Sequence, residues 1–116
     1  MASTRFHESE ETLSAETREM HRAITSLMEE LEAVDWYNQR IDATADAELA
    51  RILEHNRDEE KEHAAMVLEW IRRQDPVFEK HLARFLFRSG PLAEAEGEDD
   101  PDCSLAIGSL RSEEAA

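Results

Sequence analysis

Apolar residues recur three or four positions apart along most of the chain, which is the period of one helix face. In the first long segment the pattern runs through Met20, Ile24, Leu27, Leu31, Val34 and Ile41. It predicts a helix over residues 15–42, with Ser14 as its N-cap. Residues 44–46 form a short link, and Asp46 caps a second predicted helix over residues 47–74. Because the link is short, the two helices are expected to be antiparallel neighbours.

A shorter third helix is predicted after Asp75 and Pro76, because aspartate caps a helix and proline suits its first position. Ser89-Gly90-Pro91 is expected to end this helix. Beyond it the composition changes, since residues 91–116 hold eight acidic residues and one basic residue. These signals divide the chain into a flexible N-terminus (1–13), a helical domain (14–90), an acidic disordered linker (91–102) and a C-terminal segment (103–116).

Composition narrows the class of protein. The 116 residues suffice for one small domain, and the net charge of −15 disfavours binding to nucleic acid or to an anionic membrane. No apolar run approaches the ~18 residues of a membrane span, and the N-terminus lacks the apolar core of a signal peptide. Cys103 is the only cysteine, so no intrachain disulfide is expected. An all-α cytoplasmic protein is therefore predicted.

Two polar residues interrupt the apolar face of the second helix. That face continues through Leu49, Ile52, Asn56, Glu60, His63, Val67 and Trp70. Burying a carboxylate there is costly unless it is paired or bound to a metal ion. A Glu-x-x-His pair that points into a helical bundle is the ligand motif of carboxylate-bridged di-iron sites. Glu60 and His63 are therefore candidate metal ligands.

Glu30 interrupts the apolar face of the first helix in the same way. It lies about as far before the link between the helices as Glu60 lies after it, so the two are expected to face each other. Two helices cannot enclose a broad apolar face, and a symmetric dimer would bury it in a four-helix bundle. A bundle di-iron site needs two Glu-x-x-His motifs. This chain has one Glu-x-x-His motif, at Glu60 and His63, so one chain would supply half of a di-iron site.

Less specific explanations exist for each candidate. The Glu-x-x-His pair occurs by chance in acidic helices, where it can form ion pairs at a helix rim. Glu29 and Glu32 fit a solvated acidic face as well as a role in guiding metal ions. Trp36 and Tyr37 are more often core residues than cofactor ligands, although the hydroxyl of Tyr37 could reach the site. The acidity as a whole also confers solubility.

Three segments resemble a known family. Residues 28–37 (MEELEAVDWY) and 55–66 (HNRDEEKEHAAM) are similar to the two helix motifs of the encapsulated ferritins. Residues 104–110 (SLAIGSL) resemble the short peptides that dock cargo proteins to the inner wall of encapsulin shells. The first two motifs are long and specific, and the likeness covers roughly residues 14–90.

This resemblance implies a helical-hairpin subunit that dimerises into a ferritin-like four-helix bundle, with the dimers assembled into a decameric ring. It also implies a di-iron centre at the dimer interface, with Glu30, Glu60 and His63 of both chains as ligands. Trp36 and Tyr37 match residues near that centre. The pair Glu29 and Glu32 matches a second, outer site for Ca²⁺ or another divalent cation. The docking residues would be Leu105, Ile107, Gly108, Ser109 and Leu110.

The function expected on this basis is that of a ferroxidase. It would oxidise Fe(II) with O2 and deliver Fe(III) for mineral storage inside an encapsulin nanocompartment in the cytoplasm. Two alternatives stay open. One is a non-enzymatic acidic helical scaffold or cargo adaptor, and the other is a different di-metal enzyme, such as a rubrerythrin-like peroxidase or a manganese protein.

Overall fold

The computed structural model describes residues 5–97, which contain helices and no β-strand. Its helices are η1 (Glu10–Thr12, a 3-10 turn), α1 (Ala15–Ala43), α2 (Ala47–Gln74), α3 (Pro76–Phe85) and α4 (Leu92–Ala95). The prediction of an all-α chain is confirmed. The described residues fall into two units, 5–71 and 72–97, and each is considered by itself.

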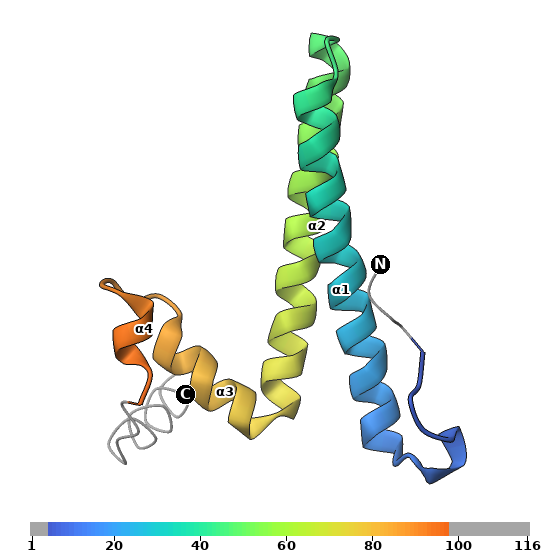
Figure 1. Cartoon of the computed structure of the whole chain (residues 1–116), viewed down its shortest axis with the longest axis vertical. Helices are drawn as coiled ribbons and strands as arrows, with labels where there is room; N and C mark the ends of the chain where they lie inside the picture. Colours follow the sequence, from blue (N-terminus) through green and yellow to red (C-terminus); the bar gives the residue numbers. More distant parts are fainter. Residues whose placement is uncertain (1–4, 98–116) are drawn as a thin grey trace, which may run out of the picture. The chain divides into compact units, whose positions relative to one another are not determined.

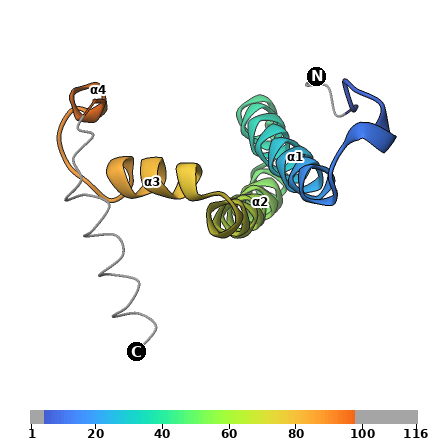
Figure 2. The ribbon, with the colours of Figure 1, turned by 90° about the horizontal axis from the view of Figure 1, so that it is seen from below.

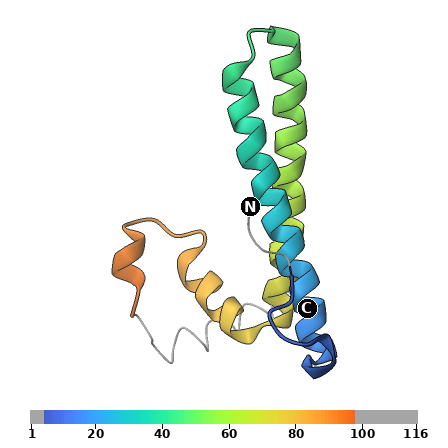
Figure 3. The ribbon, with the colours of Figure 1, turned by 45° about the vertical axis from the view of Figure 1, so that its right-hand side comes forward.

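Helices α1 and α2 form an antiparallel hairpin that runs side by side over most of its length (Figures 1 and 3). The Ser14 hydroxyl accepts a hydrogen bond from the Thr17 amide at 3.1 Å and begins α1. Asp46 accepts a bond from the Leu49 amide at 3.0 Å and begins α2. The second helix keeps its predicted bounds, and the first extends one residue further, to Ala43.

The hairpin has almost no core of its own. Within residues 5–71 only Ala64 and Ile71 are buried. Large apolar side chains that stay exposed on the two helices are Ile24, Leu31, Trp36, Leu49, Ile52, Met66 and Trp70. This number of exposed apolar side chains on two helices favours an interaction site on the hairpin. This finding agrees with the expectation that a second chain covers the hairpin.

The second unit begins with a capped helix. The Asp75 carboxylate accepts hydrogen bonds from the amides of Val77 (2.9 Å) and Phe78 (3.1 Å), as predicted for the start of α3. Glu79 in the first turn is buried and accepts a 2.6 Å bond from Arg72. The helix ends at Phe85, earlier than the predicted stop at residues 89–91, and Phe87 takes a left-handed backbone conformation (φ 57°).

Two expectations for segments outside the helical domain need correction. The prediction of a disordered linker over residues 91–102 is wrong for its first turn, because residues 92–95 form α4 and Ala95 is buried. Residues 5–13, predicted as flexible, contain η1, and the Phe6 ring lies 4.5 Å from the ring of His21. Both segments thus contain a short helical turn although their composition is polar. The C-terminal segment 103–116 lies outside the described residues.

Candidate metal centre

Three potential metal ligands converge at the middle of the hairpin. Glu30 comes from α1, and Glu60 and His63 come from α2. One ligand atom from each lies within 4.8 Å of the others. The His63 Nδ1 is 3.6 Å from Oε2 of Glu30 and 3.5 Å from Oε2 of Glu60. Two carboxylates and one imidazole at these separations can bind a common divalent cation.

The positions of these side chains follow from helix geometry and chain reversal. Glu60 and His63 are three residues apart and share one helix face. Glu30 and Glu60 are each fifteen residues from Ala45 in the turn, so an antiparallel hairpin places them opposite each other. Figure 2, seen along the hairpin, shows α1 and α2 lying directly beside each other. The structure therefore brings together the three residues that the sequence singled out, although their role as ligands stays a prediction.

The cluster lies at the surface of the single chain. The side chains of Glu30 and Glu60 are 25% and 26% exposed, and that of His63 is 44% exposed. Three donors of this kind also leave coordination positions open on a bound ion. A di-iron site in a helical bundle uses four glutamates and two histidines. One chain thus carries two glutamates and one histidine, half the number of such side chains in that ligand set.

The two carboxyl groups disfavour each other's charge. A proton shared in a hydrogen bond with Glu60 raises the pKa of Glu30 above its ordinary value, and partial burial adds to the effect. The neighbouring His63 acts in the opposite direction. Because a cation would offset the repulsion between the carboxylates, the site is electrostatically suited to a metal ion.

Glu30→Gln is expected to stabilise the metal-free protein at neutral pH. The pKa of this carboxyl is higher in the folded state than its ordinary value of about 4.3, so the group stabilises the fold when the pH is below that ordinary value. The contribution is lost as the pH rises through the folded-state pKa. Glutamine mimics the protonated form, so relief of roughly 0.5 kcal/mol would raise the Tm by about 3 °C at pH 7. Thermal unfolding at pH 7 and at pH 4, with EDTA present, measures this difference.

The increase in Tm of the Glu30→Gln variant should disappear near pH 4, where Glu30 of the parent is itself protonated. Glu29→Gln is the matched control, because Glu29 is the exposed neighbour on the same helix. An unchanged or lower Tm for Glu30→Gln at pH 7 would contradict the repulsion between Glu30 and Glu60.

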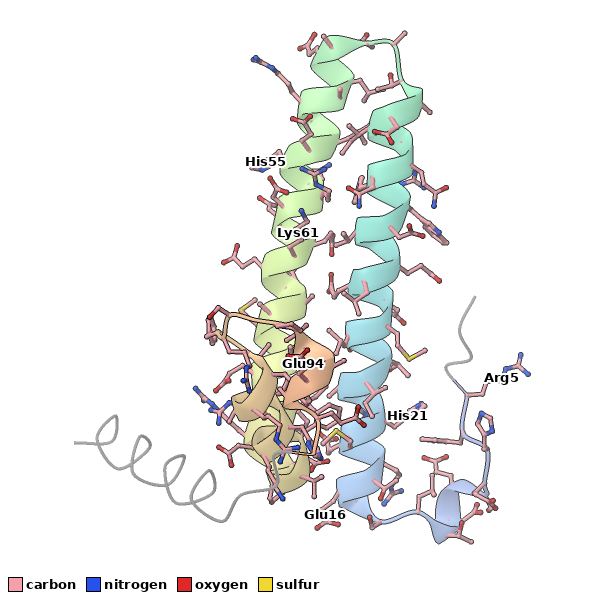
Figure 4. All side chains as sticks on the ribbon, turned by 60° about the vertical axis from the view of Figure 1, so that its left-hand side comes forward. Arg5, Glu16, His21, His55, Lys61 and Glu94 are labelled. Atoms are coloured by element: carbon pink, nitrogen blue, oxygen red, sulfur yellow. The ribbon has the colours of Figure 1, made fainter. Side chains whose placement is uncertain are left out.

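The other predicted residues lie outside this cluster. Within residues 5–97, Glu29 and Glu32 belong to no group of three acidic, histidine or cysteine side chains that converges on one point. The Arg40 guanidinium lies 6.0 Å from the centre of the Trp36 ring and 5.6 Å from that of Tyr37. These aromatic rings therefore pack with a cation of their own helix. On α2, His55 projects away from α1 and pairs with a glutamate one turn on (Figure 4).

The sequence did not predict one contact that joins the two helices of the hairpin near the cluster. Arg57, one turn before Glu60, donates a 3.1 Å hydrogen bond to the Asn38 side chain on α1. Its side chain is 24% exposed and also pairs with Asp58. The signal was present, because Asn38 interrupts the apolar face of its helix. This polar bond joins the two helices in the register that sets Glu30 against Glu60.

The geometry defines a helical-hairpin protein with a carboxylate and histidine cluster, and the comparisons with known proteins identify it as ferritin-like. A family model described as EncFtn-like matches residues 5–89. The chain belongs to the EncFtn-like family. A crystal structure of protein ne0167 from Nitrosomonas europaea is 65% identical, with a TM-score of 0.74, and the match covers 76% of this chain and 97% of that one.

Curated relatives carry names of the same kind. The encapsulated ferritin-like protein of Rhodospirillum rubrum is 51% identical, over 98% of this chain and 93% of its own length. The encapsulin nanocompartment cargo protein EncC of Myxococcus xanthus is 36% identical, over 80% of this chain and 85% of its own length. In the part of this chain that the structure describes, no helix is long and apolar enough to cross a membrane.

Proposed function

We propose that this protein is a ferroxidase that oxidises Fe(II) with O2 between two paired subunits. The observation that carries the proposal is the convergence of Glu30, Glu60 and His63 within 4.8 Å, from both helices of the hairpin. Membership of the EncFtn-like family supports it. Carboxylate oxygens suit the ferric product, and the imidazole supplies a nitrogen ligand that binds Fe(II) well.

The proposed site needs two chains. Pairing of two hairpins would bring together four glutamates and two histidines, the ligand set of a bundle di-iron site. The partial exposure of His63 is consistent with a ligand that completes its surroundings at an interface. We further propose that such pairs assemble into a ring of ten chains.

The residues have distinct tasks in this reaction. Glu30 and Glu60 lie opposite each other, and their carboxylates bind the two Fe(II) substrates and offset the positive charge of the ions. His63, one turn after Glu60, orients the bound ions. Each Fe(II) gives up one electron, so two ions and two protons reduce one O2 to H2O2, and four ions and four protons reduce one O2 to two water molecules. The Fe(III) product would leave for storage elsewhere, because a thin bundle has no storage cavity.

We also propose that the protein works as cargo inside an encapsulin shell. The names of the Rhodospirillum and Myxococcus relatives place those proteins in encapsulated systems. The Rhodospirillum match extends over 98% of this chain. The C-terminal residues Leu105, Ile107 and Leu110, with Gly108 and Ser109, would dock to the shell wall.

Aerobic oxidation assays test the enzymatic proposal. The purified protein is expected to oxidise Fe(II) faster than buffer does, with a fixed ratio of O2 consumed to iron oxidised. A rate equal to that of buffer would favour an acidic scaffold. Turnover of peroxide, or a preference for manganese over iron, would favour a different di-metal enzyme.

A further inference from the structure

Helix α3 and the residues on either side of it are basic, although the protein as a whole is strongly acidic. Residues 72–88 hold five of the 13 basic residues but only two of the 28 acidic ones. Both of these carboxylates have contacts of their own, since Asp75 caps α3 and the buried Glu79 accepts a hydrogen bond from Arg72. The second unit therefore has a local excess of positive charge.

Three of the cations follow one side of α3. Lys80 and Arg84 are four residues apart, so they share a helix face. Arg88, four residues further on, folds back onto the last turn, because its Nη1 donates a 3.2 Å hydrogen bond to the Arg84 carbonyl. Like charges at this spacing destabilise a helix, so an anionic segment beside them would stabilise α3. Lys80, Arg84 and Arg88 form the basic face of α3.

An acidic stretch of the chain begins next to this face. Helix α4 contacts α3, and Ala95 of α4 is 1% exposed. The described residues end at Gly97, and residues 98–102 (EDDPD) carry four carboxylates and no cation. Fully extended, five residues span up to ~17 Å, whereas Lys80 and Arg84 lie ~6 Å apart along the axis of α3. The short connection to α4 gives the acidic segment a high effective concentration at the basic face.

We propose that the basic face of α3 binds the acidic segment 98–102 of the same chain. Ion pairs at the surface are individually weak and screened by salt, so the contact is reversible. Its release would add five residues to the reach of the C-terminal segment. This consequence rests on the proposed docking role of residues 105–110, whereas the contact itself does not.

The single cysteine permits a direct measurement, because Cys103 immediately follows the acidic segment. A nitroxide label on Cys103 of the full-length protein should show a motionally restricted component in its EPR spectrum at ~0.01 M salt, where charges interact over ~30 Å. At ~1 M salt the screening length is ~3 Å, and this component should be lost. A spectrum that does not change with salt would overturn the proposal.

Neutral variants of the basic face test which cations take part. Lys80→Gln/Arg88→Gln should raise the ratio of unrestricted to restricted label about threefold or more at low salt, as expected for the loss of two surface ion pairs. Arg84 is kept, because its side chain is partly buried. Arg51→Gln/Lys61→Gln is the matched control, which removes two cations from exposed positions of α2 and should change the ratio less than about 1.5-fold. Equal effects of the two double variants would contradict the assignment of the face.

Variants of the acidic segment leave α3 untouched, so damage to the helix cannot explain their effect. Replacing the four carboxylates of residues 98–102 by amides should release the label to the same extent as Lys80→Gln/Arg88→Gln does. Exchanged charges test the contact itself. Lys80→Glu/Arg88→Glu should release the label, and lysines at the four acidic positions of the same chain should restore the restricted component. Without that restoration the proposed contact is wrong.

Mixed assemblies distinguish a contact within one chain from a contact between copies. A minority of parent chains is co-expressed with an excess of chains that carry Lys80→Gln, Arg88→Gln and Cys103→Ser, and the purified mixture is then labelled. The restricted component should persist, because each labelled chain keeps its own basic face. Its loss would assign the segment to a neighbouring copy and overturn the proposal. These measurements use neither iron nor a shell, so their failure is distinct from a failure of the proposed function.

Discussion

His63→Ala is expected to lower the initial rate of aerobic Fe(II) oxidation at least tenfold, on the scale of ~10–100-fold for losses around a metal site. The variant removes the one nitrogen donor of the cluster, which lies within 3.6 Å of both carboxylates. In the proposed site each ligand comes from both paired chains, so each substitution would remove two ligands. Glu30→Ala and Glu60→Ala are expected to act in the same direction.

Glu62→Ala is the matched control for the carboxylate variants. Glu62 lies beside His63 on the same helix but is exposed and outside the cluster. It removes the same charge and should leave the initial rate within about twofold of the parent. Oxidation by the three cluster variants as fast as by the parent would contradict the proposed site.

Deletion of residues 103–116 is expected to abolish loading into a co-expressed encapsulin shell while the oxidation rate stays unchanged. Burial of Leu105, Ile107 and Leu110 in apolar pockets would provide most of the docking energy, at ~1.5–3 kcal/mol for each fully buried side chain. Co-purification of the protein with assembled shells measures the loading. The oxidation rate of the free protein is measured in parallel.

A shorter truncation is the control for this experiment. Ending the chain after Arg111 keeps the three apolar residues and removes only Ser112, two acidic residues and two alanines. That variant should load as the parent does. Full loading after deletion of residues 103–116 would refute the docking role of the C-terminal segment.

Long periodic elements were predictable from the sequence, whereas short ones were not. The hydrophobic period and the caps Ser14, Asp46 and Asp75 placed the three main helices, because these signals are local. Helix α4 and the turn η1 lack such a period. Ala95 is buried in α4, and Phe6, just before η1, contacts His21. Contacts of this kind leave no local pattern in the sequence.

The candidate site was likewise predictable from the sequence only in part. Glu30, Glu60 and His63 could be chosen because they are polar residues on apolar helix faces at equal distances from the turn. The Arg57–Asn38 bond depends on side chains of two helices meeting in one register, which sequence spacing alone does not define. Sequence therefore identifies the clustered side chains better than it identifies the contacts between the two helices.

Anomalous diffraction at the iron edge, from crystals exposed to Fe(II), tests the central claim most directly. Two iron peaks for each pair of chains are expected, both within coordination distance of Glu30, Glu60 and His63 side chains from the two subunits. Crystals that contain paired chains but show no iron between these residues, or iron only at other positions, would contradict the account.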